Sequence, residues 1–258
     1  MKQKMLVKAM YVCLFVSCLF NNTLYAKSRQ AKPLPGTAIF VMVEVNNSLG
    51  PTIKTKKLTF DKDYIKGEIL VPQIDGLNDK SFEQKLNKEL LKEALTRQKS
   101  ILKDAKMYAK DLKVDQMTPQ FEYLESFTPI KTREPYFILE LFKYQYSGGA
   151  HGLANFSYLV VDTSKSKVVT LKDLFKDQVN YRDIINEQIS QMIKKREAQG
   201  EFFFTGSDGF QSISETQPFY INEQGDLVIV FNVYEIAPYA AGPQYFVIPH
   251  TFLSSYLK

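Results

Sequence analysis

The feature that most limits how this chain can fold is the position of its two cysteines. Cys13 and Cys18 both lie within the first 26 residues, so everything from Lys27 onward folds without a thiol. Disulfides, zinc–thiolate centres and a cysteine nucleophile are therefore excluded for that region. The remaining 232 of the 258 residues suffice for one large or two small domains. We expect a hydrophobic core alone to stabilise them.

The first 26 residues have the pattern of a secretory signal peptide. Lysines at the start precede an uncharged run whose apolar centre is Met10–Phe20. That centre is shorter than the about 18–20 apolar residues of a membrane-spanning helix. Leu24-Tyr25-Ala26 ends in a small residue, so we predict cleavage after Ala26 and no membrane span in the mature protein. The expected location is extracytoplasmic: periplasmic, secreted or attached to the envelope. The alternatives are a lipid anchor on Cys18 and an uncleaved N-terminal anchor.

Cleavage also changes the charge of the working protein. The predicted mature chain keeps 30 basic and 28 acidic side chains, a net charge of +2 instead of +5. A dominant basic surface is therefore absent from the composition, and we expect no nucleic-acid binding.

Alternating patterns that are typical of strands occupy most of the chain beyond a proline-containing linker at residues 27–36. The predicted strands are Ala38–Val45, Thr52–Phe60, Tyr64–Val71, Gln120–Phe127, Tyr136–Tyr146, Leu153–Asp162, Pro218–Ile221, Leu227–Val233 and Tyr245–Ile248.

Two segments have the three- and four-residue apolar spacing of amphipathic helices. The first begins at Asp79 or Ser81 and continues to Ala109, and the second covers Tyr181–Glu197. Shorter helical turns are expected at Leu171–Phe175 and Thr251–Leu257. The order predicts an α+β fold with antiparallel β-sheets and helices packed on one face, in two related or intertwined subdomains.

The most distinctive local string connects two predicted strands and reads Tyr146-Ser-Gly-Gly-Ala-His-Gly152. Its glycines supply backbone angles that other side chains disfavour, so we expect a tight, shaped turn. Within it we select Tyr146, Gly148, Gly149 and His151 as candidate binding residues. A purely local role for His151, with its ring bonded to nearby backbone, is the alternative.

A second string, Tyr234–Pro243, leaves a strong strand and turns through two prolines and several small residues. Aromatic side chains on a rigid loop are typical of binding surfaces. We therefore select Pro238, Tyr239 and Gly242 as further candidate binding residues. The alternative is a rigid connection whose tyrosine covers the edge of the core.

Motifs for catalysis are missing from the sequence. His151 and His250 are the only histidines, about 100 residues apart, and neither HExxH nor Gly-x-Ser-x-Gly occurs. We therefore predict no catalytic residues, no metal site and no cofactor, and an enzyme is the less favoured interpretation.

Several of these strings resemble a known family of extracytoplasmic domains. Val71–Leu77 and Tyr146–Gly152 are similar to motifs of the PdaC-type domain, and Leu171–Phe175, Tyr234–Gly242 and Val247–Pro249 to motifs of the RsiV-type domain. The resemblance implies a PdaC-like domain at residues 37–163 and an RsiV-like domain at residues 164–258. In the peptidoglycan deacetylase that gives the first domain its name, this module precedes a separate metal-dependent catalytic domain. In the anti-sigma factor that names the second, the module is the outer sensor that binds lysozyme. The resemblance therefore implies a binding module.

Three functions are compatible with these observations. The favoured one is an exported, non-catalytic envelope module that binds a lysozyme-like protein or peptidoglycan, a cell-wall glycan. The first alternative is a hydrolase of envelope polymers that uses carboxylates or His151. The second is a structural or assembly factor of the cell envelope.

Overall fold

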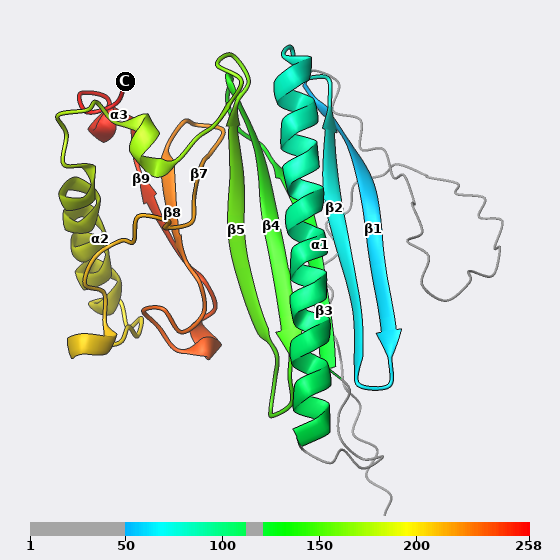
Figure 1. The fold of residues 1–258 in the computed structure, drawn as a ribbon. Coiled ribbons are helices and arrows are strands. Elements are labelled where there is room, and N and C mark those ends of the chain that lie inside the picture. Colours follow the sequence, from blue (N-terminus) through cyan, green and yellow to red (C-terminus); the bar gives the residue numbers. More distant parts are fainter. Residues whose placement is uncertain (1–49, 112–120) are drawn as a thin grey trace, which may run out of the picture. The chain divides into compact units, whose positions relative to one another are not determined.

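The computed structural model of the protein describes residues 50–111 and 121–258. The predicted signal peptide, the linker and the strand expected at Ala38–Val45 lie outside these residues. Within them, the chain forms a six-stranded sheet, β1 to β6, and a three-stranded sheet, β7 to β9 (Figure 1). The predicted α+β class is confirmed.

The larger sheet has its strands in chain order: β1 (Thr52–Lys62), β2 (Ile65–Asp75), β3 (Phe121–Ile130), β4 (Tyr136–Tyr146), β5 (Leu153–Asp162) and β6 (Lys167–Val168). It differs from the antiparallel expectation at one place, because β2 and β3 pair in parallel, with Ile65 opposite Phe121. A helix, α1 (Lys80–Asp111), connects these two strands and carries the chain back along the sheet, so that β3 runs in the same direction as β2. The short β6 was not predicted, since two residues carry no periodic signal.

Helix α1 covers one face of this sheet (Figure 1). Its apolar side packs on buried side chains of β1, β2 and β3 that include Leu58, Ile69 and Tyr123. Strand alternation places Leu139 on the same side, whereas its neighbour Ile138 points to the other face. Both faces of the central strands are therefore buried, each against a different part of the chain.

The smaller sheet consists of β7 (Phe219–Ile221), β8 (Leu227–Phe231) and β9 (Gln244–Ile248). Helix α2 (Tyr181–Glu197), which has the predicted bounds, packs on it through Ile185 and Ile189. Four short helical turns belong to the same region: η1 (Leu171–Leu174), η2 (Gly206–Asp208), η3 (Tyr239–Ala241) and α3 (His250–Leu253). Ile138 and Val160 of the larger sheet lie in one hydrophobic cluster with Ile229 and Phe246. A continuous core therefore joins the two sheets.

None of the helices in the two described ranges is both long and apolar enough to cross a membrane.

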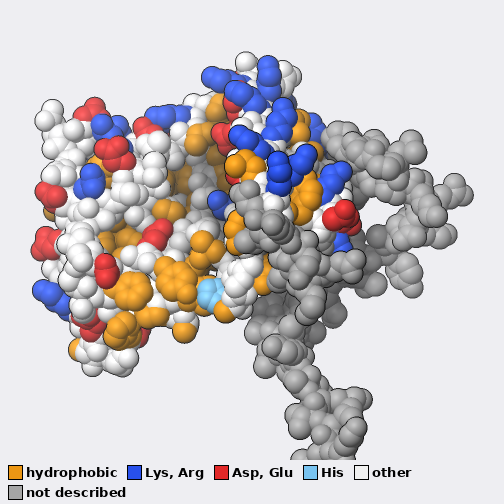
Figure 2. Space-filling model, turned by 60° about the horizontal axis from the view of Figure 1, so that its bottom comes forward, with side chains coloured by type: hydrophobic (Ala, Val, Ile, Leu, Met, Phe, Trp, Pro, Cys, Tyr) orange, Lys and Arg blue, Asp and Glu red, His pale blue; other side chains and the backbone are white. Residues whose placement is uncertain are grey.

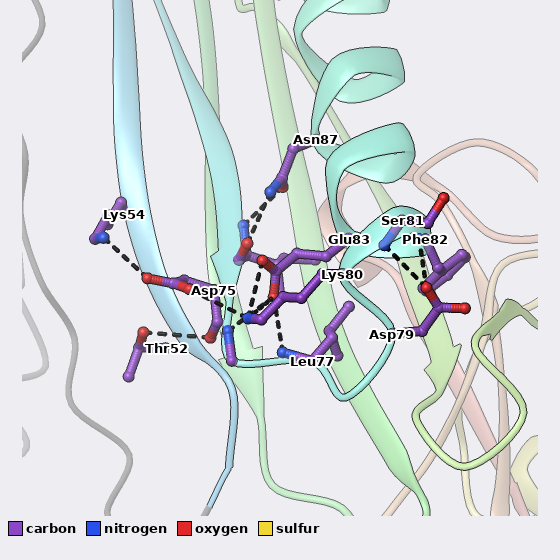
Figure 3. A network of polar contacts seen from close by, with 12 residues as sticks. Thr52, Lys54, Asp75, Leu77, Asp79, Lys80, Ser81, Phe82, Glu83 and Asn87 are labelled. Atoms are coloured by element: carbon purple, nitrogen blue, oxygen red, sulfur yellow. Dashed lines mark hydrogen bonds and ion pairs between the residues drawn. The ribbon is translucent and has the colours of Figure 1, made fainter.

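Polar side chains of α1 hold the end of β2 in place (Figure 3). Glu83 is only 8% exposed, and its carboxylate accepts hydrogen bonds from the backbone N–H groups of Gly76 and Leu77, at 2.8 Å each. The amide of Asn87 accepts from the N–H of Ile74 at 2.8 Å and donates to its carbonyl at 2.7 Å. Asp79 caps the helix, as expected, by accepting from the N–H groups of Ser81 and Phe82.

Replacement of Glu83 by alanine tests this junction. The substitution leaves two backbone donors of the β2–α1 connection without their acceptor, so we expect the free energy of unfolding to fall by about 1–3 kcal/mol. Urea denaturation measures the loss. The control is Glu89→Ala in the same helix, where the carboxylate is 46% exposed and the change should stay within about 0.5 kcal/mol. Equal effects of the two substitutions would contradict the assigned role.

Candidate functional site

The turn between β4 and β5 contains the first group of predicted site residues. Gly148 and Gly149 have φ angles of +97° and +94°, the left-handed region that glycine adopts without strain. The hydroxyl of Tyr146 donates to the carbonyl of Gly149 at 2.9 Å. These three residues shape the turn, and His151 projects from it as an exposed side chain.

The connection between β8 and β9 contains the second group. Pro238 immediately precedes the helical turn η3, and Gly242 ends that turn with a φ of +69°. The buried side chain of Gln244 donates to the carbonyls of Ala241 and Gly242, at 2.9 and 3.0 Å. Arg196 of α2 in turn donates to Gln244 at 2.6 Å, which fixes the loop from behind.

The structure brings these two loops together. The rings of His151 and Tyr239 stack with centroids 4.0 Å apart and planes inclined by 20°. A third ring, that of Tyr234, lies 5.6 Å from Tyr239 and is 51% exposed. We call His151, Tyr234 and Tyr239 the aromatic patch. Figure 2 views the molecule from the end at which both loops lie and shows hydrophobic side chains gathered beside a histidine.

The contacts of its two ring nitrogens indicate the tautomer of His151. Its Nδ1 lies 3.0 Å from the carbonyl oxygen of Gly152, and because a carbonyl only accepts, Nδ1 carries the proton. In the neutral ring, Nε2 is then an acceptor for the hydroxyl of Tyr234, at 3.4 Å. The hydroxyl of Tyr239 also donates to Gly152, at 3.4 Å. The histidine thus has the predicted local backbone bond and, in addition, contacts with the second loop.

Asn232 joins the two loops at their base. Its amide accepts from the N–H of Phe156 at 2.6 Å and donates to the carbonyl of the same residue at 3.1 Å. Phe156 lies on β5, four residues after Gly152, and Asn232 lies two residues before Tyr234. The asparagine is 8% exposed. This pair therefore sets the register of one loop against the other.

A groove of about 290 Å³ lies elsewhere, between α1 and the strands β2 to β5. Its wall contains a buried carboxylate, Glu125, to which Arg97 donates two hydrogen bonds of 2.7 Å. The hydroxyl of Tyr123 donates to the same carboxylate, and burial, followed by the contact with Glu125, raises the pKa of Tyr123. Glu125 is thus fully engaged by protein groups. Across residues 50–111 and 121–258, no group of three or more metal-ligating side chains comes together.

Of the predicted binding residues, His151 and Tyr239 form the patch, whereas Tyr146, Gly148, Gly149, Pro238 and Gly242 shape the loops that carry it. Two contributors were not singled out from the sequence. The first is Tyr234, whose backbone has a φ of +68°. The second is Asn232, which acts only through its contact with β5. The available sequence signal for Tyr234 was its place as the first residue of the string Tyr234–Pro243.

Comparisons with known proteins agree with the two-part organisation of the site. Residues 58–154 match the family model described as deacetylase PdaC, and residues 172–251 match that of a protein of unknown function, DUF3298. The first match includes His151, and the second includes Tyr234 and Tyr239. The chain is thus a protein in which a PdaC-type segment and a DUF3298 segment follow each other. These matches and the relatives below support the RsiV-like and PdaC-like resemblance that the motifs predicted.

Individual relatives support this assignment. The anti-sigma-V factor RsiV of Bacillus subtilis strain 168 is 27% identical over 213 residues, which cover 78% of this chain and 70% of the relative. A DUF3298 family structure from Bacteroides fragilis NCTC 9343 superposes with a TM-score of 0.62 at 19% identity, covering 83% of this chain and 96% of that one. A second, from Pseudomonas aeruginosa PAO1, gives 0.56 at 16% identity, covering 82% and 95%. The two structures show that the fold is shared.

Replacement of Asn232 by alanine tests the junction below the patch. The N–H and carbonyl of Phe156 lose their partner, so we expect the free energy of unfolding, measured by urea denaturation, to fall by about 1–3 kcal/mol. Asn155→Ala is the matched control, since the side chain of this neighbouring asparagine on β5 is only partly buried and should cost about 0.5 kcal/mol or less. A loss confined to the control would show that the Asn232 pair is not a stabilising contact.

Proposed function

We propose that the protein is an exported, non-catalytic module of the cell envelope that binds a lysozyme-like protein through the aromatic patch. The observation that carries this proposal is the stack of His151 on Tyr239, with Tyr234 beside it, on two loops that hydrogen bonds hold in place. Exposed aromatic side chains on a rigid support bury large areas at little cost in conformational entropy, which is why protein interfaces use them.

The family supports the same proposal. One relative is by name an anti-sigma factor, which is a regulatory protein rather than an enzyme. The resemblance of both halves to extracytoplasmic domains agrees with the predicted signal peptide and with a location outside the cytoplasm. A net charge of +2 for the predicted mature chain gives little repulsion toward a basic partner.

A cell-wall glycan is the second ligand class. Tyrosine and histidine rings also form platforms on which the apolar faces of sugars stack. In the patch, His151 and Tyr234 are exposed and Tyr239 is partly exposed. Hydrolysis has less support than binding. Within the described residues, Nε2 of His151 faces a tyrosine hydroxyl, and the buried Glu125 is held by Arg97.

Retention assays with immobilised protein decide between these ligands. We expect lysozyme to be retained and Tyr239→Ala to weaken its binding by about tenfold or more, because truncation of a central aromatic hot-spot residue costs about 2 kcal/mol or more. Purified peptidoglycan is tested in parallel with the same variants. If only peptidoglycan is retained, and Tyr239→Ala releases it, the glycan is the ligand.

The matched control is Phe252→Ala, which removes another partly exposed aromatic ring, 40% accessible, from helix α3. Its binding should equal that of the unmodified protein. Retention of neither lysozyme nor peptidoglycan, or equal retention by the Tyr239 and Phe252 variants, would overturn the proposal.

A further inference from the structure

A second cluster of aromatic rings lies between the two sheets, beside a carboxylate. Glu140 lies on β4, on the face opposite α1, and Tyr158 lies directly across from it on β5. The smaller sheet contributes Tyr220 from β7 and Tyr245 from β9. None of these residues belongs to the aromatic patch, and none was selected from the sequence.

The contacts in this cluster are specific. The hydroxyl of Tyr158 donates to Oε2 of Glu140 at 2.9 Å. The ring of Tyr158 packs against that of Tyr220, with centroids 4.9 Å apart. Tyr245 is 40% exposed, the largest exposed fraction of the four residues. Glu140, Tyr158 and Tyr220 are partly buried.

Among the described residues, no cationic side chain pairs with the carboxylate of this cluster. No lysine or arginine within residues 50–111 and 121–258 forms an ion pair with Glu140. Burial, followed by the negative charge of Glu140, raises the pKa of Tyr158, Tyr220 and Tyr245. The three phenols therefore remain neutral at physiological pH. A partly buried carboxylate without a cationic partner is costly, and a bound cation relieves that cost.

We propose that Glu140, Tyr158, Tyr220 and Tyr245 form a binding site for an organic cation, either a primary ammonium or a guanidinium group. Oε1 of Glu140 is the acceptor for the N–H donors of the cation, since Oε2 already accepts from Tyr158. The faces of the tyrosine rings attract the positive charge through their quadrupoles. The cation is either a free amine or the end of a lysine or arginine side chain of a partner protein.

Titration with small cations tests the site without any partner. We expect butylammonium and ethylguanidinium chlorides to shift the ring signals of ¹³C-labelled Tyr158, Tyr220 and Tyr245 in a saturable way, with a dissociation constant on the order of 1 mM. Sodium chloride at the same ionic strength should not. Glu140→Gln should weaken the binding by about tenfold or more, because it removes the charge and keeps the shape.

Two measurements keep this test interpretable. Glu122→Gln is the matched control, since Glu122 is an exposed carboxylate on β3, opposite Tyr146 and away from the cluster, and it should leave the titration unchanged. Thermal unfolding of Glu140→Gln should show no loss of stability, because the amide oxygen still accepts from Tyr158. Linear shifts without saturation, or equal binding by Glu140→Gln and the unmodified protein, would overturn the proposal.

Lysozyme retention by Glu140→Gln identifies the source of the cation. Reduced retention, together with lost amine binding, assigns the site to a side chain of the protein partner. Unchanged retention with lost amine binding assigns it to a free amine. If the unmodified protein retains no lysozyme, the function proposed above fails, whereas the amine titration still decides the cation site by itself.

Discussion

The arrangement of the candidate site depends on the amide of one asparagine. Strand β5 pairs with β6 only at Val161 and Asp162, so the backbone of Phe156, nearer the start of β5, has no strand partner on that side among the described residues. Asn232 supplies both the donor and the acceptor that a neighbouring strand would offer. Because Asn232 follows β8 and precedes Tyr234, this contact places the β8–β9 loop beside the β4–β5 turn. The aromatic patch results from that placement.

The same solution occurs at the other side of the larger sheet. Strand β2 pairs with β3 only as far as Ile69, and Asn87 of α1 then bonds to the N–H and the carbonyl of Ile74. A primary amide can replace a peptide group because it carries a donor and an acceptor in similar geometry. In both places the asparagine side chain pairs with a backbone N–H and a carbonyl that no neighbouring strand reaches, and it fixes its own segment against the sheet. The larger sheet is thus a frame to which helix α1 and the C-terminal region are attached by equivalent contacts.

Local patterns were sufficient to predict most elements. The bounds of β4, β5 and α2 follow from two-residue and 3.6-residue periodicity, which depends only on burial of one side of a strand or helix. The parallel pairing of β2 with β3 could not be predicted, because strand direction in a pair depends on the path of the connection. His151 and Tyr239 were found through unusual turn residues, whereas Asn232 and the cluster around Glu140 act through partners 76 and 18 or more residues away. The domain boundary between residues 163 and 164 and the ligand of the predicted site residues stay predictions.

The Asn232–Phe156 contact brings His151 and Tyr239 together. Nuclear Overhauser effects between the ring protons of these two residues test it most directly. We expect strong effects in the unmodified protein, as a centroid distance of 4.0 Å requires, and their weakening or loss in Asn232→Ala. Effects of equal strength in both proteins would show that the loops meet without this contact and would contradict its assigned role.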